Sequence, residues 1–141
     1  MKTLTAFLIT IAACLVSLPA WAQAEIKFDE TTHDFGSFPE SDAVKECVFT
    51  FTNVGNQPLV IHQAVPSCGC TVPEFSQEAV LPGEQGTVKV TYNGRGKYPG
   101  PFKKTVTLRT NAKTEMLRLI IKGVMTEDGA TTDSTEVAAT L

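Results

Sequence analysis

The sequence predicts an all-β fold, an antiparallel sandwich of seven to eight strands. Apolar and polar residues alternate with a period of two in several short segments. Turns rich in Gly, Pro and Asn separate these segments. No segment keeps a helical period, so a fold of alternating strands and helices is excluded.

The expected strands follow one another at intervals of about ten residues. They are residues 26–28, 33–38, 44–53, 59–65, 79–81, 87–92, 102–110 and 116–124. The first two are short, and Pro39 ends the second. The third gives the clearest signal, because Cys47, Phe49 and Phe51 face one way while the residues between them face the other.

Turn residues bound the middle strands. Asn, Gly and Pro occur in residues 53–58, and Pro66 ends the fourth strand, in which Leu59 and Ile61 are expected to point inward. The fifth strand, at residues 79–81, is short and ends in a Pro-Gly turn.

The last three strands flank a loop rich in glycine and proline. Val88, Val90 and Tyr92 are expected to face together, and the loop then covers residues 93–101. Residues 111–113 separate the final two strands, which complete the predicted sandwich.

The first 22 residues are expected to be a signal peptide, which places the mature protein in the periplasm or outside the cell. A basic residue precedes an apolar run over residues 4–18, and Ala20 and Ala22 supply the small-x-small cleavage pattern. A second cut is available after Ala24. The apolar run is short for a membrane span, and no stop-transfer charges follow it.

Lipid attachment is a rival processing route. The sequence Ile-Ala-Ala-Cys at residues 11–14 resembles a lipobox, and a lipid on Cys14 would anchor the protein in the envelope membrane. The apolar run continues past Cys14 to Trp21, however, whereas a lipoprotein turns polar directly after its cysteine. The soluble exported form is therefore favoured.

Charge is balanced in the body of the chain and acidic at its end. Residues 23–124 hold 11 basic and 11 acidic residues, so the body lacks the basic footprint that nucleic acid requires. The last 17 residues hold four acidic residues and no Lys or Arg. We expect a folded domain over residues 25–124 and a disordered tail over residues 125–141.

Six motifs occur in a recognisable order. They are residues 33–36 (HDFG), 49–59 (FTFTNVGNQPL), 67–71 (SCGCT), 81–84 (LPGE), 100–102 (GPF) and 121–124 (IKGV). Together they resemble the bacterial exported family catalogued as domain of unknown function 1573, over residues 25–124. More distantly the chain is similar to immunoglobulin-like domains of the ASPM, SPD-2 and Hydin type and to the major sperm protein fold. The resemblance implies an immunoglobulin-like sandwich and assigns no biochemical role, while the wider group consists of interaction modules. Cys47 departs from the polar or aliphatic residue expected there.

The Cys-Gly-Cys motif, expected to lie in a loop over residues 67–73, is the one cluster with candidate chemistry. Cleavage after Ala22 leaves three cysteines, Cys47, Cys68 and Cys70, an odd number in an oxidising compartment. A Cys68–Cys70 bridge closes a very small ring, whereas a bridge from Cys47 to either cysteine is structurally more ordinary. The sequence leaves both pairings open, and it also leaves open an intermolecular bridge or no bridge.

A soft metal is the alternative for these cysteines. Two thiolates two residues apart could hold Cu(I), with His33, His62 or Met116 completing the ligand shell. No second Cys/His pair has zinc-finger spacing, and the Cys-x-x-Cys helix start of thiol oxidoreductases is absent. A structural role is therefore favoured over metal binding or redox chemistry.

Basic and aromatic residues gather around the glycine- and proline-rich loop. The candidate binding residues are Arg95, Lys97, Tyr98, Lys103 and Lys104. The favoured interpretation is a solvated hairpin whose charges discourage edge pairing. The functional interpretation is a recognition loop for an acidic partner or glycan.

No nucleophile motif and no defensible pair of catalytic carboxylates occurs in the sequence. We therefore predict a non-catalytic exported module that binds another protein or an envelope component through loops or a sheet edge. It would need no cofactor. The alternative is a thiol or copper site centred on Cys68 and Cys70.

Overall fold

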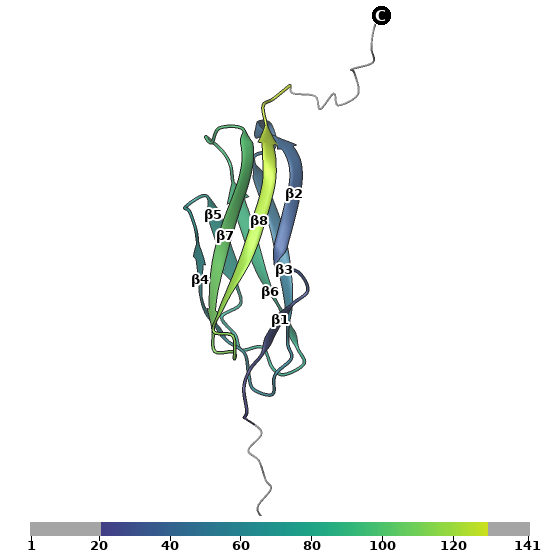
Figure 1. Cartoon of the computed structure of the whole chain (residues 1–141), viewed down its shortest axis with the longest axis vertical. Coiled ribbons are helices and arrows are strands. Elements are labelled where there is room, and N and C mark those ends of the chain that lie inside the picture. Colours follow the sequence, from purple (N-terminus) through teal and green to yellow (C-terminus); the bar gives the residue numbers. More distant parts are fainter. Residues whose placement is uncertain (1–20, 130–141) are drawn as a thin grey trace, which may run out of the picture.

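Two β-sheets pack face to face in the computed structural model of the chain (Figure 1). The structure describes residues 21–129. The elements are β1 (Ile26–Phe28), β2 (Thr32–Pro39), the 3-10 helix η1 (Glu40–Asp42), β3 (Val44–Asn53), β4 (Ile61–Pro66), β5 (Thr71–Phe75), β6 (Gln85–Asn93), β7 (Gly100–Thr110) and β8 (Met116–Thr126). The predicted all-β sandwich is confirmed.

The two sheets differ in strand direction. The first has the order β1-β3-β6-β5, and all its neighbours are antiparallel. The second has the order β2-β8-β7-β4, and in it β2 runs parallel to β8. The second sheet is therefore mixed, not wholly antiparallel as expected. Parallel neighbours need a long connection, and here the rest of the domain supplies it.

The inner faces of the central strands form the core. As predicted, Cys47, Phe49 and Phe51 of β3 are buried, and so are Val88, Val90 and Tyr92 of β6. The second sheet contributes buried Val106, Leu108, Leu119 and Ile121. Burial of large apolar side chains from both sheets is the main force that holds such a sandwich together.

The strands around the middle of the chain differ from the expected ones. Leu59 and Ile61 both point inward, but β4 begins only at Ile61. Leu59 instead forms an isolated bridge with Val80, and this bridge is all that remains of the strand expected at residues 79–81. The Pro-Gly turn that follows Val80 leaves too few residues for a longer ladder.

Strand β5 was expected to be part of a loop. It contains Pro73, which has no backbone N–H, and proline argues against a central strand. The structure resolves this by placing β5 at the edge of the first sheet, where it pairs with β6 alone. At the other end of the chain β8 continues to Thr126, because Met125 is buried in the core.

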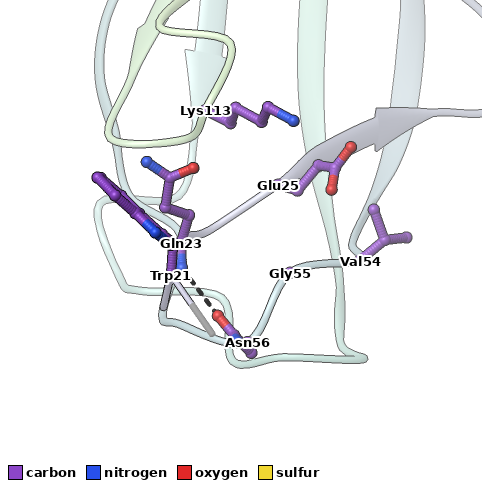
Figure 2. Close-up of a pocket in the computed structure, with 7 residues that line it drawn as sticks. All are labelled: Trp21, Gln23, Glu25, Val54, Gly55, Asn56 and Lys113. Carbon is purple, nitrogen blue, oxygen red and sulfur yellow. Dashed lines mark hydrogen bonds between the residues drawn. The ribbon is translucent and has the colours of Figure 1, made fainter. Parts of the chain in front are cut away.

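Residues 23–25 belong to the folded domain. Ala24 is 2% exposed, and its carbonyl accepts a hydrogen bond from the Lys113 N–H at 2.9 Å. Gln23 is tied to Asn56 twice, through its N–H (2.8 Å) and its carbonyl (3.0 Å). Figure 2 shows the first of these bonds.

A chain that begins at Glu25 should therefore be less stable than one that begins at Gln23. Losing the buried Ala24 and three hydrogen bonds should lower the unfolding temperature by at least about 4 °C, the shift that 1 kcal/mol produces in a domain of this size. Calorimetry of both forms measures the difference. Equal midpoints would contradict the anchoring of residues 23–24.

Asn53 closes the turn after β3 and is fully buried. Its side-chain amide donates to the carbonyls of Gln57 (2.7 Å) and Val80 (2.9 Å), and its Oδ1 accepts from the Gly55 N–H (3.0 Å). The side chain thus joins the turn to the isolated bridge at Val80.

Asn53→Ala should destabilise the domain by at least about 2 kcal/mol, because it leaves buried backbone groups without partners. Urea unfolding provides the measurement. The matched control is Asn56→Ala, where the same change at an exposed position should cost less than about 1 kcal/mol. Similar losses in both variants would show that burial of Asn53 is not the cause.

Within residues 21–129 no helix has the length and apolar character needed to cross a membrane. The predicted signal peptide up to residue 20, including Cys14, lies outside the described residues. The predicted tail beyond Gly129 lies outside them as well.

Candidate functional site

Two loops that cross between the sheets meet at one end of the sandwich, the upper end in Figure 1. Residues 67–70 connect β4 to β5, and residues 94–99 connect β6 to β7. The Asn93 N–H donates to the Cys70 carbonyl at 2.8 Å. The two loops line a shallow hollow of about 290 Å³, formed by Cys68, Gly69, Cys70, Asn93, Arg95 and Lys97. We call this region the Cys-Gly-Cys end.

The structure thus joins two features that the sequence presented separately. Cys68 and Cys70 share the hollow with Arg95 and Lys97, although some 25 positions of sequence separate the two pairs. Asn93, which sequence reasoning missed, completes the lining. Asn93 could have been identified from the sequence, because it lies at the end of a predicted strand next to a glycine-rich loop.

A stack of aromatic rings supports this end of the domain. Tyr92 of β6 and Phe102 of β7 lie face to face, with ring centroids 4.0 Å apart and planes 3° apart. The Phe38 ring meets Phe102 edge-on at 5.8 Å. Tyr92 is buried, and this burial raises the pKa of its hydroxyl.

The loop over residues 94–99 is fixed at its base. The Gly94 N–H donates to the Ala43 carbonyl at 2.8 Å, and a Cβ at Gly94 would come within 3.0 Å of Met125 Sδ. The Arg95 N–H donates to Asn93 Oδ1 at 3.1 Å. These contacts hold the start of the loop against the core while its side chains point outward.

The structure pairs Cys68 with Cys70 as a disulfide, with Cα atoms 5.4 Å apart. The Thr71 N–H donates to the Cys68 carbonyl at 3.3 Å and closes the turn. The side chain of Thr71 is buried directly beneath the bridge. Its Oγ1 lies 3.7 Å from Cys68 Sγ and 4.0 Å from Cys70 Sγ, and sequence reasoning gave this hydroxyl no role.

Cys47 is apart from this pair. It lies in the middle of β3, opposite Val90, and is 7% exposed. Burial, with a smaller contribution from Glu30, raises the pKa of its thiol to about 11. Of the two pairings that the sequence left open, the structure has the one within the Cys-Gly-Cys motif and a free thiol at Cys47.

The Cys47 thiol should be inert in the folded protein, because the thiolate is the reactive form and burial disfavours it. N-ethylmaleimide at pH 8 should leave the native mass unchanged and should add one label after unfolding in guanidinium chloride. A Tyr98→Cys variant serves as the exposed control and should label at once. Rapid labelling of native Cys47 would contradict the described burial.

The two histidines do not reach the cysteine pair. His33 meets the Phe35 ring edge-on at 4.8 Å, and its Nδ1 lies 3.3 Å from Glu30 Oε1. His62 lines a separate hollow with Arg109 and Met116. Across residues 21–129 no three His, Cys, Asp or Glu side chains come together in a way that could hold a metal ion. The proposed auxiliary ligands of a copper site are therefore not assembled around Cys68 and Cys70.

Of the predicted binding residues, Arg95, Lys97 and Tyr98 lie on the loop over residues 94–99, while Lys103 and Lys104 follow on β7 and point to opposite faces of the sheet. Tyr98 is 97% exposed, and Arg95, Lys97 and Lys103 are exposed while Lys104 is half-buried. None of these cations pairs with a carboxylate of the described chain. Residues 94–122 hold eight Lys or Arg and a single acidic residue, Glu115. Of these eight, Arg109 and Lys113 lie at the opposite end of the domain. Glu40 and Asp42 of η1 lie at the same end as the loop, so the excess of positive charge there is local to Arg95 and Lys97.

A third hollow lies at the opposite end of the domain. Figure 2 shows Trp21, Gln23, Glu25, Val54, Gly55, Asn56 and Lys113 around it. Trp21 precedes the predicted cleavage point, so cleavage after Ala22 would remove part of its wall. The hollow presents one carboxylate and one ammonium group, and it offers less chemistry than the Cys-Gly-Cys end.

The fold and the site define an immunoglobulin-like β-sandwich with a cysteine pair beside a basic, aromatic loop. Residues 26–125 match the family described as "Protein of unknown function (DUF1573)", and the chain belongs to that family. The resemblance inferred from the six motifs is confirmed. No curated protein matches the sequence.

Several solved structures share the fold. A protein of unknown function from Porphyromonas gingivalis W83 is 17% identical with a TM-score of 0.62, over 77% of this chain and 51% of that one. This chain thus spans about half the length of that protein. The ASH/PapD-like domain 7 of human CEP192 is 16% identical, with a TM-score of 0.54 over 75% of this chain and 87% of that one.

The periplasmic chaperone SfaE is 14% identical, with a TM-score of 0.51 over 74% of this chain and 59% of that one. At such identities the likeness shows a shared PapD-like, immunoglobulin-like fold. It assigns no residue role.

Proposed function

We propose that the protein is an exported, non-catalytic module that binds another protein through the Cys-Gly-Cys end. The exposure of Tyr98 carries the proposal. The Tyr98 ring is 97% exposed, and hydration of its apolar surface is unfavourable, so burial against a partner would be favourable. Tyrosine and arginine are also enriched among the residues that dominate protein–protein binding. Arg95 and Lys97 flank Tyr98 on the same loop, and the loop is fixed at its base.

The sheet edges are poor sites for strand addition, the other binding mode that the sequence allowed. Strand β1 has three residues, and β5 contains Pro73. Register shifts interrupt β2 between Asp34 and Ser37 and β4 between Ile61 and Gln63. Short, kinked or proline-containing edges discourage pairing with another chain. The loops are therefore favoured over an edge.

The unpaired cations favour a partner protein with an acidic surface. Arg95, Lys97 and Lys103 are exposed, so they can steer an acidic partner toward the loop and align it. The likeness to a periplasmic chaperone supports both export and protein binding. The predicted signal peptide supports export independently.

Photo-crosslinking in cells that naturally express the protein tests this surface. A benzophenone amino acid at position 98 should give a discrete protein adduct upon irradiation. The control position is Met116, which is 54% exposed at the other end of the domain and should give none. Equal adducts from both positions would argue against a specific site.

Affinity measurements with the captured partner, once it is identified and purified, complete the test. Tyr98→Ala should weaken binding at least about tenfold, as expected for a central aromatic anchor, whereas Met116→Ala should leave it unchanged. An unchanged affinity in the Tyr98→Ala variant would refute the proposed role of the loop.

A further inference from the structure

We propose that the Cys68–Cys70 disulfide is a thiol–disulfide exchange site that oxidises a pair of cysteines on the bound partner. This inference rests on the proposed function for its partner and concerns the same end of the domain. Three features of the described residues carry it: the small ring, the cations beside it and the buried Thr71 hydroxyl.

The Cys68–Cys70 disulfide contributes little to the stability of the fold. A disulfide stabilises a fold mainly by closing a long loop of the unfolded chain, and this one joins residues only two positions apart. Hydrogen bonds already fix both sides of the turn. The Ser67 N–H donates to the Thr105 carbonyl at 2.8 Å, and the Cys70 carbonyl accepts from the Asn93 N–H at 2.8 Å. A stabilising role therefore explains the bridge poorly.

The bridge lies in a hollow that favours thiolates. Arg95 and Lys97 line the hollow together with both cysteines, and no carboxylate is among its lining residues. Neighbouring cations stabilise the thiolates that enter and leave during exchange. Cys47 offers the contrast within the same chain, because its thiol is buried without a cation beside it.

Thr71 supplies a hydrogen-bond donor on the inner side of the bridge. Its side chain is 1% exposed, and the two sulfur atoms are the partners within reach of its hydroxyl among the described residues. A buried hydroxyl that faces only sulfur gains a stronger acceptor when the bridge opens to a thiolate. The site can therefore accommodate the reduced state as well as the oxidised one.

The exchange proceeds in two balanced steps. A partner thiolate attacks Cys68 Sγ, the S–S bond breaks, and Cys70 leaves as a thiolate that accepts a hydrogen bond from Thr71. Cys68 is the attacked atom because Cys70 packs against the core. The partner's second thiolate then attacks the partner sulfur that is bonded to Cys68 Sγ, and Cys68 leaves as a thiolate. The partner loses two electrons and two protons, and the Cys68–Cys70 pair gains them.

Exchange kinetics with small thiols test the site on the chain that begins at Gln23. Reduced glutathione carries carboxylates in addition to its thiolate, β-mercaptoethanol has the thiolate charge alone, and intact mass after alkylation reports the open bridge. Arg95→Gln/Lys97→Gln should slow glutathione at least about tenfold at low salt and β-mercaptoethanol about twofold, because the more negative thiol is steered more strongly by the two cations. Arg109→Gln/Lys113→Gln removes the same charges at the far end and should have no effect.

Two further sets of variants examine the chemistry. Thr71→Val should slow exchange with both thiols, and Thr71→Ser should restore it.

An acidic synthetic peptide with two cysteines should be oxidised mole for mole by the wild type. For trapping, an acidic peptide with a single cysteine is supplied as its 2-pyridyl disulfide. The Cys68 thiolate of Cys70→Ser should attack the peptide sulfur, expel pyridine-2-thione and hold the peptide as a mixed disulfide, whereas Cys68→Ser should trap much less. A bridge that glutathione leaves intact, or equal rates in the two charge variants, would overturn the proposal.

The inference and the proposed function can fail separately. In one outcome, the Cys68→Ser/Cys70→Ser chain still crosslinks through position 98 and the wild-type bridge does not react. That outcome refutes the exchange site and supports the binding surface. A reactive bridge combined with no adduct at position 98 refutes the binding surface and leaves no assigned partner for the exchange.

Discussion

The stacked rings of Tyr92 and Phe102 are the contact on which the Cys-Gly-Cys end depends. One ring comes from each sheet, so the stack sets the separation of the sheets where both connecting loops leave them. Residues 94–99 start two positions after Tyr92 and end three positions before Phe102. The turn that carries Cys68 and Cys70 is hydrogen-bonded to Asn93, which follows Tyr92 in β6. A change in this stack would move every group of the hollow.

Much of the fold follows from local patterns. Strict alternation in residues 44–53 and 87–92 identified the central strands and their inner faces, because a sheet with one buried face requires it. The motifs identified the family. Strand β5 was missed because Pro73 reads locally as a loop signal, and its edge position is a property of the whole sheet. The parallel pairing of β2 with β8 joins segments more than 80 residues apart, which no local pattern encodes.

The site was predictable in its parts and not in its assembly. The sequence identified the cysteine motif and the basic, aromatic loop as separate candidates, and it left the cysteine pairing open. Their meeting depends on the register that places Asn93 beside Cys70. Thr71 illustrates the same limit. A threonine after a cysteine carries no signal by itself, and its hydroxyl becomes relevant only because the fold buries it beneath the sulfur atoms.

The anchoring of Ala24 also determines which end of the sandwich lies next to the N-terminal junction. The described chain enters at the lower end of the long axis, and the loops with Tyr98 and the cysteine pair lie toward the upper end (Figure 1). Because Gln23 and Ala24 are bonded into the domain, they leave no flexible hinge at the point of entry. Whatever precedes Gln23 therefore joins the domain at the end opposite the Cys-Gly-Cys end, so the loop over residues 94–99 is displayed away from that junction (Figure 1).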